Sequence, residues 1–203
     1  MKIICIGRNY AAHARELKNE VPDKPIIFLK PDTALLKDNK PFFIPEWATE
    51  IHYETEVVYK ISKNGKYIAE EFASNYFNEI SLGIDFTERN LQNELKAKGL
   101  PWELSKSFDG SAVISHFIKS SEIENLKDIQ FRLEKNGEIV QNAHTTEMIF
   151  PIEKIISFVS QYITLRAGDL IYTGTPQGVG PVKKGDQLTG FIGNSEMFSF
   201  KVK

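Results

Sequence analysis

Cysteine is nearly absent from this sequence. Of 203 residues only Cys5 is a cysteine, so no intramolecular disulfide can form and a cysteine-rich zinc site is excluded. Cys5 lies in the apolar run IICI, where we expect a small buried thiol of the core.

Long apolar runs are missing as well. No stretch approaches the roughly 20 apolar residues that a membrane span needs. The apolar run at the start of the chain is too short for the core of a signal peptide. We therefore expect a cytoplasmic protein.

The sequence has no excess of either charge. Its 25 Lys and Arg residues against 27 Asp and Glu residues give a net charge of -2. The basic residues are scattered, without the clusters typical of proteins that bind nucleic acid or anionic membranes. We expect neither nucleic acid nor membrane as a partner.

Most common enzyme motifs are absent too. IICIGRNY lacks the later glycines of a dinucleotide fingerprint, and GTPQGVGPVKKGD lacks the GK[ST] of a P-loop. The four histidines form no HExxH, and there is no GxSxG. These absences remove the usual nucleotide-binding, zinc-peptidase and serine-hydrolase hypotheses.

The chain has the composition of an ordinary globular protein, with 41% hydrophobic and 26% charged residues. We expect one domain over residues 1–203. Short apolar runs bounded by turn residues predict strands, and the NG within residues 131–143 predicts a hairpin. Helical patterns occupy residues 9–20, 68–80, 87–102 and 152–165. Because strands and helices do not alternate strictly, we predict an α+β fold, predominantly β, with mixed and mostly antiparallel sheets.

The segment EIHYETEVVY raises the main functional question. On a strand, His52, Glu54 and Glu56 would share one face. Two carboxylates about 7 Å apart repel each other unless water or a cation separates them. The segment is therefore either a solvated edge or part of a metal site. Asp85, at the end of the apolar strand SLGID, could supply a third carboxylate, or could cap the next helix, as Thr87 also could.

Further polar residues fall at helix starts and turns. His13 and Glu16 are three residues apart on a predicted helix, so they form either a general base with its orienting carboxylate or a surface ion pair. Lys30 and Lys106 lie in apolar surroundings. We expect Lys30 to extend its ammonium to the surface, whereas Lys106, in LPWELSKSFDG, is the better functional candidate.

Taken together, these segments resemble the fumarylacetoacetate hydrolase superfamily. The matching segments appear in family order: IGRNYAAHARE (6–16), IFLKP (27–31), IHYETEVVY (51–59), GIDFTERNLQ (83–92), LPWELSKSFDG (100–110), TTEMIF (145–150) and TGTPQGVGPVKKGD (173–186). The chain is most similar to the short, single-domain branch, which includes acylpyruvate hydrolases that also decarboxylate oxaloacetate. The resemblance implies mixed sheets that form a partly open barrel or roll, and a homodimer.

The resemblance also implies roles for individual residues. Glu54, Glu56 and Asp85 would bind a divalent cation, Mg²⁺ or Mn²⁺, with Ca²⁺ as a substitute in a crystal. His13 and Glu16 would activate water, and Lys106 would contact the metal-bound substrate. The substrate pocket would be lined by Arg8, Gln92 and Thr175, and His52 would support the cation ligands without binding the cation itself.

The implied activity is metal-dependent hydrolysis or cleavage of C–C bonds in β-keto or β-diketo acids. Acylpyruvate hydrolysis and oxaloacetate decarboxylation would share a metal-bound pyruvate enolate. The alternative within the family is an isomerase, acting on 2-hydroxyhepta-2,4-diene-1,7-dioate, or an oxaloacetate keto–enol tautomerase. A binding domain that has lost turnover is the non-enzymatic alternative.

Overall fold

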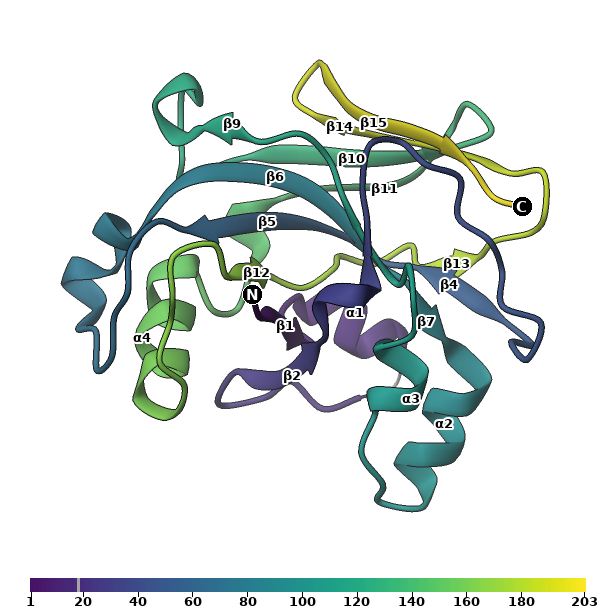
Figure 1. Ribbon diagram of the computed structural model, residues 1–203, viewed down its shortest axis with the longest axis horizontal. Coiled ribbons are helices and arrows are strands. Elements are labelled where there is room, and N and C mark those ends of the chain that lie inside the picture. Colours follow the sequence, from purple (N-terminus) through teal and green to yellow (C-terminus); the bar gives the residue numbers. More distant parts are fainter. Residues whose placement is uncertain (18) are drawn as a thin grey trace.

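The computed structural model describes residues 1–17 and 19–203 (Figure 1). Within these residues, strands predominate over short helices, which confirms the predicted α+β class. The helices are α1 (Ala11–Glu16), α2 (Arg89–Ala97), α3 (Glu103–Lys106) and α4 (Ile152–Tyr162), with short 3₁₀ turns η1 (Asp32–Ala34), η2 (Glu70–Tyr76), η3 (Ser120–Glu122) and η4 (Thr145–Glu147). No helix among the described residues is long and apolar enough to cross a membrane.

The largest sheet has the strand order β2-β1-β12-β5-β6-β8-β3, and β9 pairs with β6 beside this path. Its strands are β1 (Ile3–Gly7), β2 (Ile26–Lys30), β3 (Leu35–Leu36), β5 (Thr55–Ile61), β6 (Phe77–Asp85), β8 (Ala112–Ile114), β9 (Ile118–Lys119) and β12 (Leu170–Tyr172). The pairs β1–β12 and β3–β8 are parallel, and the remaining pairs are antiparallel. The predicted mixed, mostly antiparallel pairing is therefore confirmed.

Two smaller antiparallel sheets complete the fold. One has the order β11 (Glu138–His144), β10 (Gln130–Lys135), β14 (Gln187–Ile192) and β15 (Ser195–Lys201), and includes the predicted hairpin. The other has the order β13 (Gly180–Pro181), β4 (Ile51–Tyr53) and β7 (Thr87–Glu88). The four-stranded sheet lies over β5 and β6, and β1 and β2 lie on their other side, so that the curved sheets form a partly open barrel (Figure 1).

The core fills the space between these sheets. From Ile80 to Asp85, β6 is buried at every residue, because the four-stranded sheet covers one of its faces and the remaining elements cover the other. Phe198 of β15 and Leu82 of β6 meet at Gly190, where an added Cβ would lie 2.4 Å from the Phe198 ring. The helix α4 confirms the one predicted at residues 152–165 and buries Ile155, Ile156 and Val159 on its inner face.

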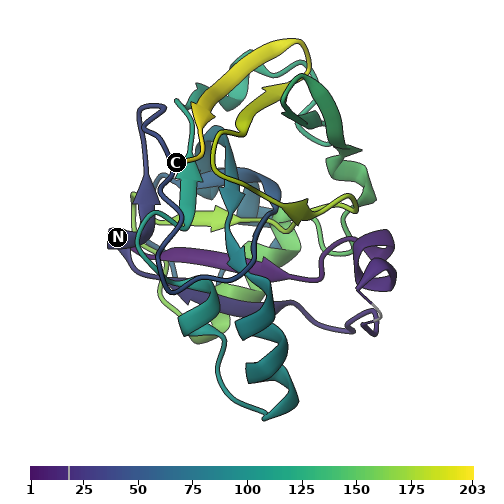
Figure 2. The same cartoon turned by 90° about the vertical axis from the view of Figure 1, so that its right-hand side faces the viewer.

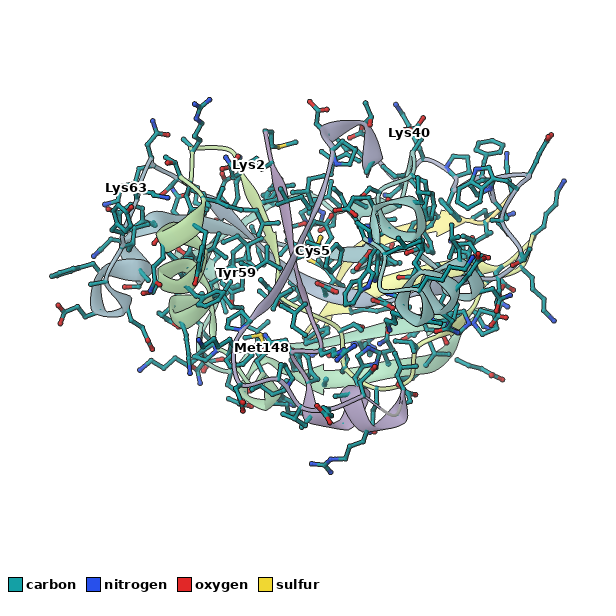
Figure 3. The ribbon with its side chains drawn as sticks, turned by 90° about the horizontal axis from the view of Figure 1, so that it is seen from below. Lys2, Cys5, Lys40, Tyr59, Lys63 and Met148 are labelled. Atoms are coloured by element: carbon teal, nitrogen blue, oxygen red, sulfur yellow. The ribbon has the colours of Figure 1, made fainter. Side chains whose placement is uncertain are left out.

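Cys5 lies on β1 in the middle of the molecule (Figure 3). Its side chain is fully buried, which confirms the expected core thiol. Burial, followed by the nearby Asp85 carboxylate, raises the pKa of Cys5 well above its ordinary value. This thiol therefore has the properties of an apolar packing residue rather than of a nucleophile.

The helix predicted at residues 68–80 is wrong. The segment forms the 3₁₀ turn η2 and then enters β6 at Phe77. Phe72, which belonged to the predicted helical face, is 57% exposed. Phe77 instead pairs with Ile61 of β5 and packs its ring edge-on against Tyr59, with 4.9 Å between the ring centroids. Pairing with a distant strand overrides the local helical spacing here.

Two other predicted helices differ in their boundaries. The helix expected over residues 9–20 spans only Ala11–Glu16, with Leu17 as its C-cap. Asn9 precedes the helix because its side chain donates to the carbonyl oxygens of Phe150 and Thr173. Lys18, which was also part of the prediction, lies outside the described residues. The helix expected from residue 87 begins at Arg89. Its N-terminus is capped by Glu88, which accepts a hydrogen bond from the Leu91 N–H at 2.5 Å, and not by Thr87, which belongs to β7.

Figure 2 shows α1 at one side of the molecule and α2 with α3 projecting below the sheets. Both groups of helices follow directly on strands of the functional region, since α1 comes after β1, and α2 comes after β6 and β7. Side chains from these two helical groups can therefore converge on the ends of β1, β5 and β6.

Gly83 of β6 gives a direct test of this packing. An added Cβ would lie 2.6 Å from both the Tyr172 ring and the Val113 carbonyl oxygen. We expect Gly83→Ala to lower the free energy of unfolding by about 1–3 kcal/mol, because the backbone of β8 cannot move aside without breaking its pairing. Denaturant unfolding measures this loss.

Gly7→Ala is the matched control, since its Cβ would meet its nearest neighbour at 3.5 Å, an ordinary contact. An unfolding midpoint for Gly83→Ala equal to that of Gly7→Ala would contradict the packing described for β6.

Candidate active site

A small pocket lies where β1 and β6 end and β5 begins, beside α1, α2 and α3. Eight of the residues that line it were predicted from the sequence, namely Arg8, His13, Glu54, Glu56, Asp85, Gln92, Lys106 and Thr175. Glu16, the remaining predicted site residue, does not line the pocket but contacts His13. The structure thus brings the predicted set together, while the roles assigned to its members stay predictions.

Strand pairing places the three carboxylates. The Asp85 N–H at the end of β6 donates to the Glu54 carbonyl oxygen at 2.8 Å, so these two residues face each other across the sheet. Glu56 lies two residues further along β5, opposite Gly83. Carboxylate oxygens of Glu54, Glu56 and Asp85 lie within 4.8 Å of one another, and each residue is at most 5% exposed. The alternative of a solvated strand edge is therefore wrong.

Lysine and arginine side chains compensate the negative charges of Glu54 and Asp85. The Lys106 ammonium donates to Glu54 Oε2 at 2.8 Å, to Asp85 Oδ2 at 2.7 Å and to Thr87 Oγ1 at 2.6 Å. Arg89 forms an ion pair with Glu54. Burial would raise the pKa of Glu54, but Lys106 and Arg89 together hold it well below its ordinary value. Glu54 is therefore ionised.

Lys30 lies beneath this cluster and not at the surface, so the expected surface ammonium is wrong. The residue is 2% exposed, and its Nζ lies 2.7 Å from Asp85 Oδ1. The same ammonium donates to the carbonyl oxygens of Phe86 and Ser111, at 3.3 and 3.0 Å. A buried ammonium needs such partners, and these bonds join β2 to the end of β6.

Glu56 is the acid that the protein's own cations compensate least. Burial and the neighbouring Asp85 raise its pKa well above the ordinary value, and the hydrogen bond at 2.7 Å from the Gly174 N–H opposes this only in part. No lysine or arginine among the described residues forms an ion pair with it, and Asp85 Oδ1 accepts no hydrogen bond of good geometry. Three buried carboxylates, of which Glu56 has no cationic side chain paired to it among the described residues and Asp85 has one oxygen without a hydrogen bond, fit a hard divalent cation such as Mg²⁺ or Mn²⁺.

His13 and Glu16 form a contact on α1. The His13 Nδ1 lies 3.2 Å from Glu16 Oε2, and because a carboxylate only accepts, Nδ1 carries the hydrogen and Nε2 can accept a proton. The Gly178 N–H donates to Glu16 Oε1 at 3.0 Å, which fixes α1 to the loop after β12. Burial lowers the pKa of His13, although Glu54 and Glu16 oppose the shift, so that the imidazole is neutral at pH 7.

The inner face of α2 carries a second polar group. The Arg89 Nη1 donates to Gln92 Oε1 at 2.6 Å, which leaves the Gln92 amide nitrogen available as a donor. Arg89 Nε donates to His52 Nδ1 at 3.4 Å, and His52 Nε2 in turn donates to Glu50 at 2.6 Å. His52 therefore contacts the arginine that holds Glu54 and is not among the residues that line the pocket.

Thr175 is held in the loop after β12. The Gln141 amide donates to Thr175 Oγ1 at 2.8 Å, while its oxygen accepts from the Thr55 N–H at 3.0 Å. The preceding Gly174 has φ +98°, and an added Cβ would lie 2.7 Å from the Asn9 side chain. Only glycine can occupy such a position without strain, so the sequence TGT follows from the close approach of β1.

Sequence reasoning missed two basic residues of α2. Arg89 contacts Glu54, and Lys96 lines the pocket beside Trp102. Their spacing from Gln92, three residues before it and four after it, places them on the face of the helix that Gln92 occupies. That spacing was the available signal, but it needs the orientation of α2 before it indicates a site.

The comparisons with known proteins agree with this geometry. A family profile described as "Fumarylacetoacetate (FAA) hydrolase C-terminal" matches residues 2–197. The chain is 42% identical over 201 residues to the oxaloacetate tautomerase FAHD1, mitochondrial, of Mus musculus, covering 99% of this chain and 91% of the relative. It is 43% identical over 188 residues to the mitochondrial oxaloacetate decarboxylase of Dictyostelium discoideum, covering 92% and 86%.

A solved relative gives the same result for the fold. The fumarylpyruvate hydrolase of Pseudomonas aeruginosa, in complex with Mn²⁺ and pyruvate, superposes with a TM-score of 0.94 at 35% identity, covering 100% of this chain and 89% of that one. The family and the fold expected from the sequence are therefore both confirmed. This chain is an enzyme of the fumarylacetoacetate hydrolase family.

Proposed function

We propose that this enzyme acts on oxaloacetate and closely related β-keto acids by forming the enolate at C3, with the aid of a divalent cation. One observation carries the proposal: a neutral imidazole and a group of buried carboxylates face the same small pocket. The mouse and Dictyostelium relatives are named as a tautomerase and a decarboxylase of oxaloacetate, which supports this substrate class.

Glu54, Glu56 and Asp85 would hold the cation. When bound, Mg²⁺ or Mn²⁺ supplies a Lewis acid that chelates the carboxylate and ketone of a 2-oxo acid and so makes its C3 protons acidic. Support comes from Glu56. Burial, and then the charge of Asp85, raise the pKa of this carboxyl, and a bound divalent cation would offset both effects. The Pseudomonas relative, with Mn²⁺ and pyruvate, supports the same class of cation and ligand.

His13 would move the proton. In keto–enol exchange its Nε2 accepts a proton from C3 while the electron pair shifts toward the ketone oxygen. The imidazolium then returns the proton either to C3, which gives the keto form, or to that oxygen, which gives the enol. Glu16, which accepts from Nδ1, stabilises the imidazolium. Lys106, whose ammonium stays charged because Asp85 and Glu54 outweigh the effect of burial on its pKa, stabilises the negative charge on the substrate.

Decarboxylation would use the same pocket without a base. The C3–C4 bond of oxaloacetate breaks, CO₂ leaves, and the electron pair remains on C3 as the enolate of pyruvate. A proton from solvent then reaches C3, and His13 is the side chain placed to deliver it. The Gln92 amide, oriented by Arg89, can donate to the substrate throughout.

Hydrolysis of acylpyruvates is the second candidate, and the His13–Glu16 contact favours it. His13 would accept a proton from water, the hydroxide would add to C4, and the C3–C4 bond would break to give a carboxylic acid and the enolate of pyruvate. The Pseudomonas relative is named as a fumarylpyruvate hydrolase, which supports this reading. Cytoplasmic location, a homodimer and the identity of the metal in the cell stay predictions.

The function is tested with purified protein, oxaloacetate and acetylpyruvate, in Mg²⁺ and again in EDTA. Keto–enol exchange of oxaloacetate, CO₂ release and pyruvate formation are followed separately. We expect the enzyme to accelerate enolate-forming steps on oxaloacetate only when the cation is present. Acceleration that survives EDTA, or none with either substrate, would contradict the proposal.

Glu56→Gln tests the cation site. We expect this variant to bind Mn²⁺ at least about tenfold more weakly, because a neutral amide oxygen replaces a charged ligand. Titration calorimetry with Mn²⁺ measures the change, and activity should fall in parallel. Glu79→Gln, which removes a carboxylate from the half-buried ion pair with Lys60 outside the pocket, is the control and should bind Mn²⁺ as the unchanged protein does.

His13→Gln tests the base. The neutral imidazole is the active form, so protonation inactivates it, and its lowered pKa places the acid limb of kcat/KM for acetylpyruvate below pH 6.5. We expect the variant to lose this limb and about 10²–10⁴-fold of its hydrolytic rate, with a smaller loss of oxaloacetate decarboxylation.

His144→Gln is the matched control, because His144 also contacts a carboxylate, Asp128 at 2.7 Å, but does not line the pocket. An acid limb centred at or above pH 7 in the unchanged enzyme, or hydrolysis by His13→Gln at the same rate as by His144→Gln, would rule out His13 as the base.

A further inference from the structure

We propose that Lys96 and Arg8 form a distal anion site that binds the second carboxylate of dicarboxylic keto acids and selects them over monocarboxylic ones. The inference rests on the proposed function, because it assumes that a 2-oxo acid enters the pocket with its first carboxylate toward Glu54, Glu56 and Asp85. It adds Lys96 to the residues that determine which keto acid binds.

Lys96 is placed to face the substrate. It lies one helical turn after Gln92 on α2, so both side chains share a face, and both line the pocket. Its Nζ lies 5.4 Å from the centroid of the Trp102 ring, whose face attracts the ammonium. Lys98, two residues further on, is exposed and pairs with Glu94 at 2.6 Å. Among the described residues no carboxylate forms such a pair with Lys96.

Arg8 brings a second cation to the same pocket. Its backbone has φ +58°, which is unusual for a residue other than glycine, and the three hydrogen bonds of the Asn9 side chain hold the chain in place there. Its Nε is buried and has no hydrogen-bond partner among the described residues. A strained backbone and an unpaired guanidinium nitrogen both cost stability, and they occur together at functional sites.

The two cations influence each other. Burial, and then the charges of Arg8 and Arg89, lower the pKa of Lys96 to about 8, while Glu54 raises it and Lys106 lowers it further. Like charges that influence each other in this way, with no acid among the described residues paired to Lys96, destabilise the site until an anion lies between them. A carboxylate that accepts hydrogen bonds from both side chains would remove this repulsion.

The pocket is therefore lined by two kinds of charged group. The carboxylates and their cation suit the first carboxylate and the ketone of a 2-oxo acid, and Lys96 with Arg8 suits an additional negative group. Oxaloacetate carries such a group at C4, whereas acetylpyruvate has an uncharged acyl group there. The geometry points to dicarboxylic keto acids as the preferred ligands.

The test compares Lys96→Met with Lys98→Met, which removes an exposed lysine from the same helix. The probes are 3-sulfopyruvate, whose sulfonate replaces the C4 carboxylate and cannot leave as CO₂, and pyruvate, which lacks any second anionic group. Their dissociation constants are measured by calorimetry in the presence of Mg²⁺. Binding of these probes needs no turnover, so the result does not depend on whether the enzyme cleaves or isomerises its substrate.

We expect the unchanged protein and Lys98→Met to bind 3-sulfopyruvate at least about tenfold more tightly than pyruvate. In Lys96→Met this preference should fall by about tenfold, because one charge-assisted contact is lost, with a much smaller effect on pyruvate. Equal weakening of both probes would overturn the distal assignment, since Lys96 would then act on the first carboxylate or on the fold. If Lys96→Met kept the full preference for 3-sulfopyruvate over pyruvate, Lys96 would be a solvated lysine that does not contact the ligand, and the proposal would be overturned.

The pH dependence gives a readout that a structural role would not change. With oxaloacetate, kcat/KM should fall as pH rises through about 8, because Lys96 loses its charge. Lys96→Arg keeps the charge at all accessible pH values, so its alkaline limb should move up by at least about one pH unit. The same limb in both proteins would overturn the assignment. Absence of turnover in the unchanged protein would instead contradict the proposed function and leave the binding test to decide on Lys96.

Discussion

The structure depends on three carboxylates held out of water within one pocket. Each buried charge costs several kcal/mol unless a partner compensates it. Lys106 bridges Glu54 and Asp85, and Lys30 forms an ion pair with Asp85, whereas the partner of Glu56 within the described part of the chain is a backbone N–H. The protein thus compensates its acids incompletely, and the deficit lies where a divalent cation would fit. The lysines stabilise the buried acids in the absence of a cation, and a bound divalent cation would supply the remaining positive charge.

The rest of the fold serves to bring charges of both signs to this place. The β5–β6 pairing sets the acids side by side, α1 brings the neutral imidazole of His13, and α2 brings basic side chains. The pocket is consequently lined by charges of both signs, the three carboxylates on the one hand and Arg8 and Lys96 on the other. Under the proposal made above, this field would orient a substrate that carries a chelating keto acid and a second anionic group.

Local patterns in the sequence predicted much of the site, because Glu54 with Glu56 and His13 with Glu16 follow strand and helix spacing within one element. Contacts between distant segments could not be predicted in this way. Lys30 was expected at the surface since its partner, Asp85, is far along the chain, and Lys96 resembled any solvated lysine until α2 was oriented. The wrong helix at residues 68–80 has the same cause, because only pairing with β5 makes its second half a strand.

The central claim is that Glu54, Glu56 and Asp85 together bind a divalent cation. A crystal structure of the protein grown with Mn²⁺, with anomalous differences measured at the manganese edge, tests it most directly. The account predicts a single strong peak bounded by oxygens of all three carboxylates, with Glu56 among the ligands. A saturated crystal in which Glu54 and Asp85 still pair only with Lys30, Lys106 and Arg89, and manganese lies elsewhere or nowhere, would contradict it.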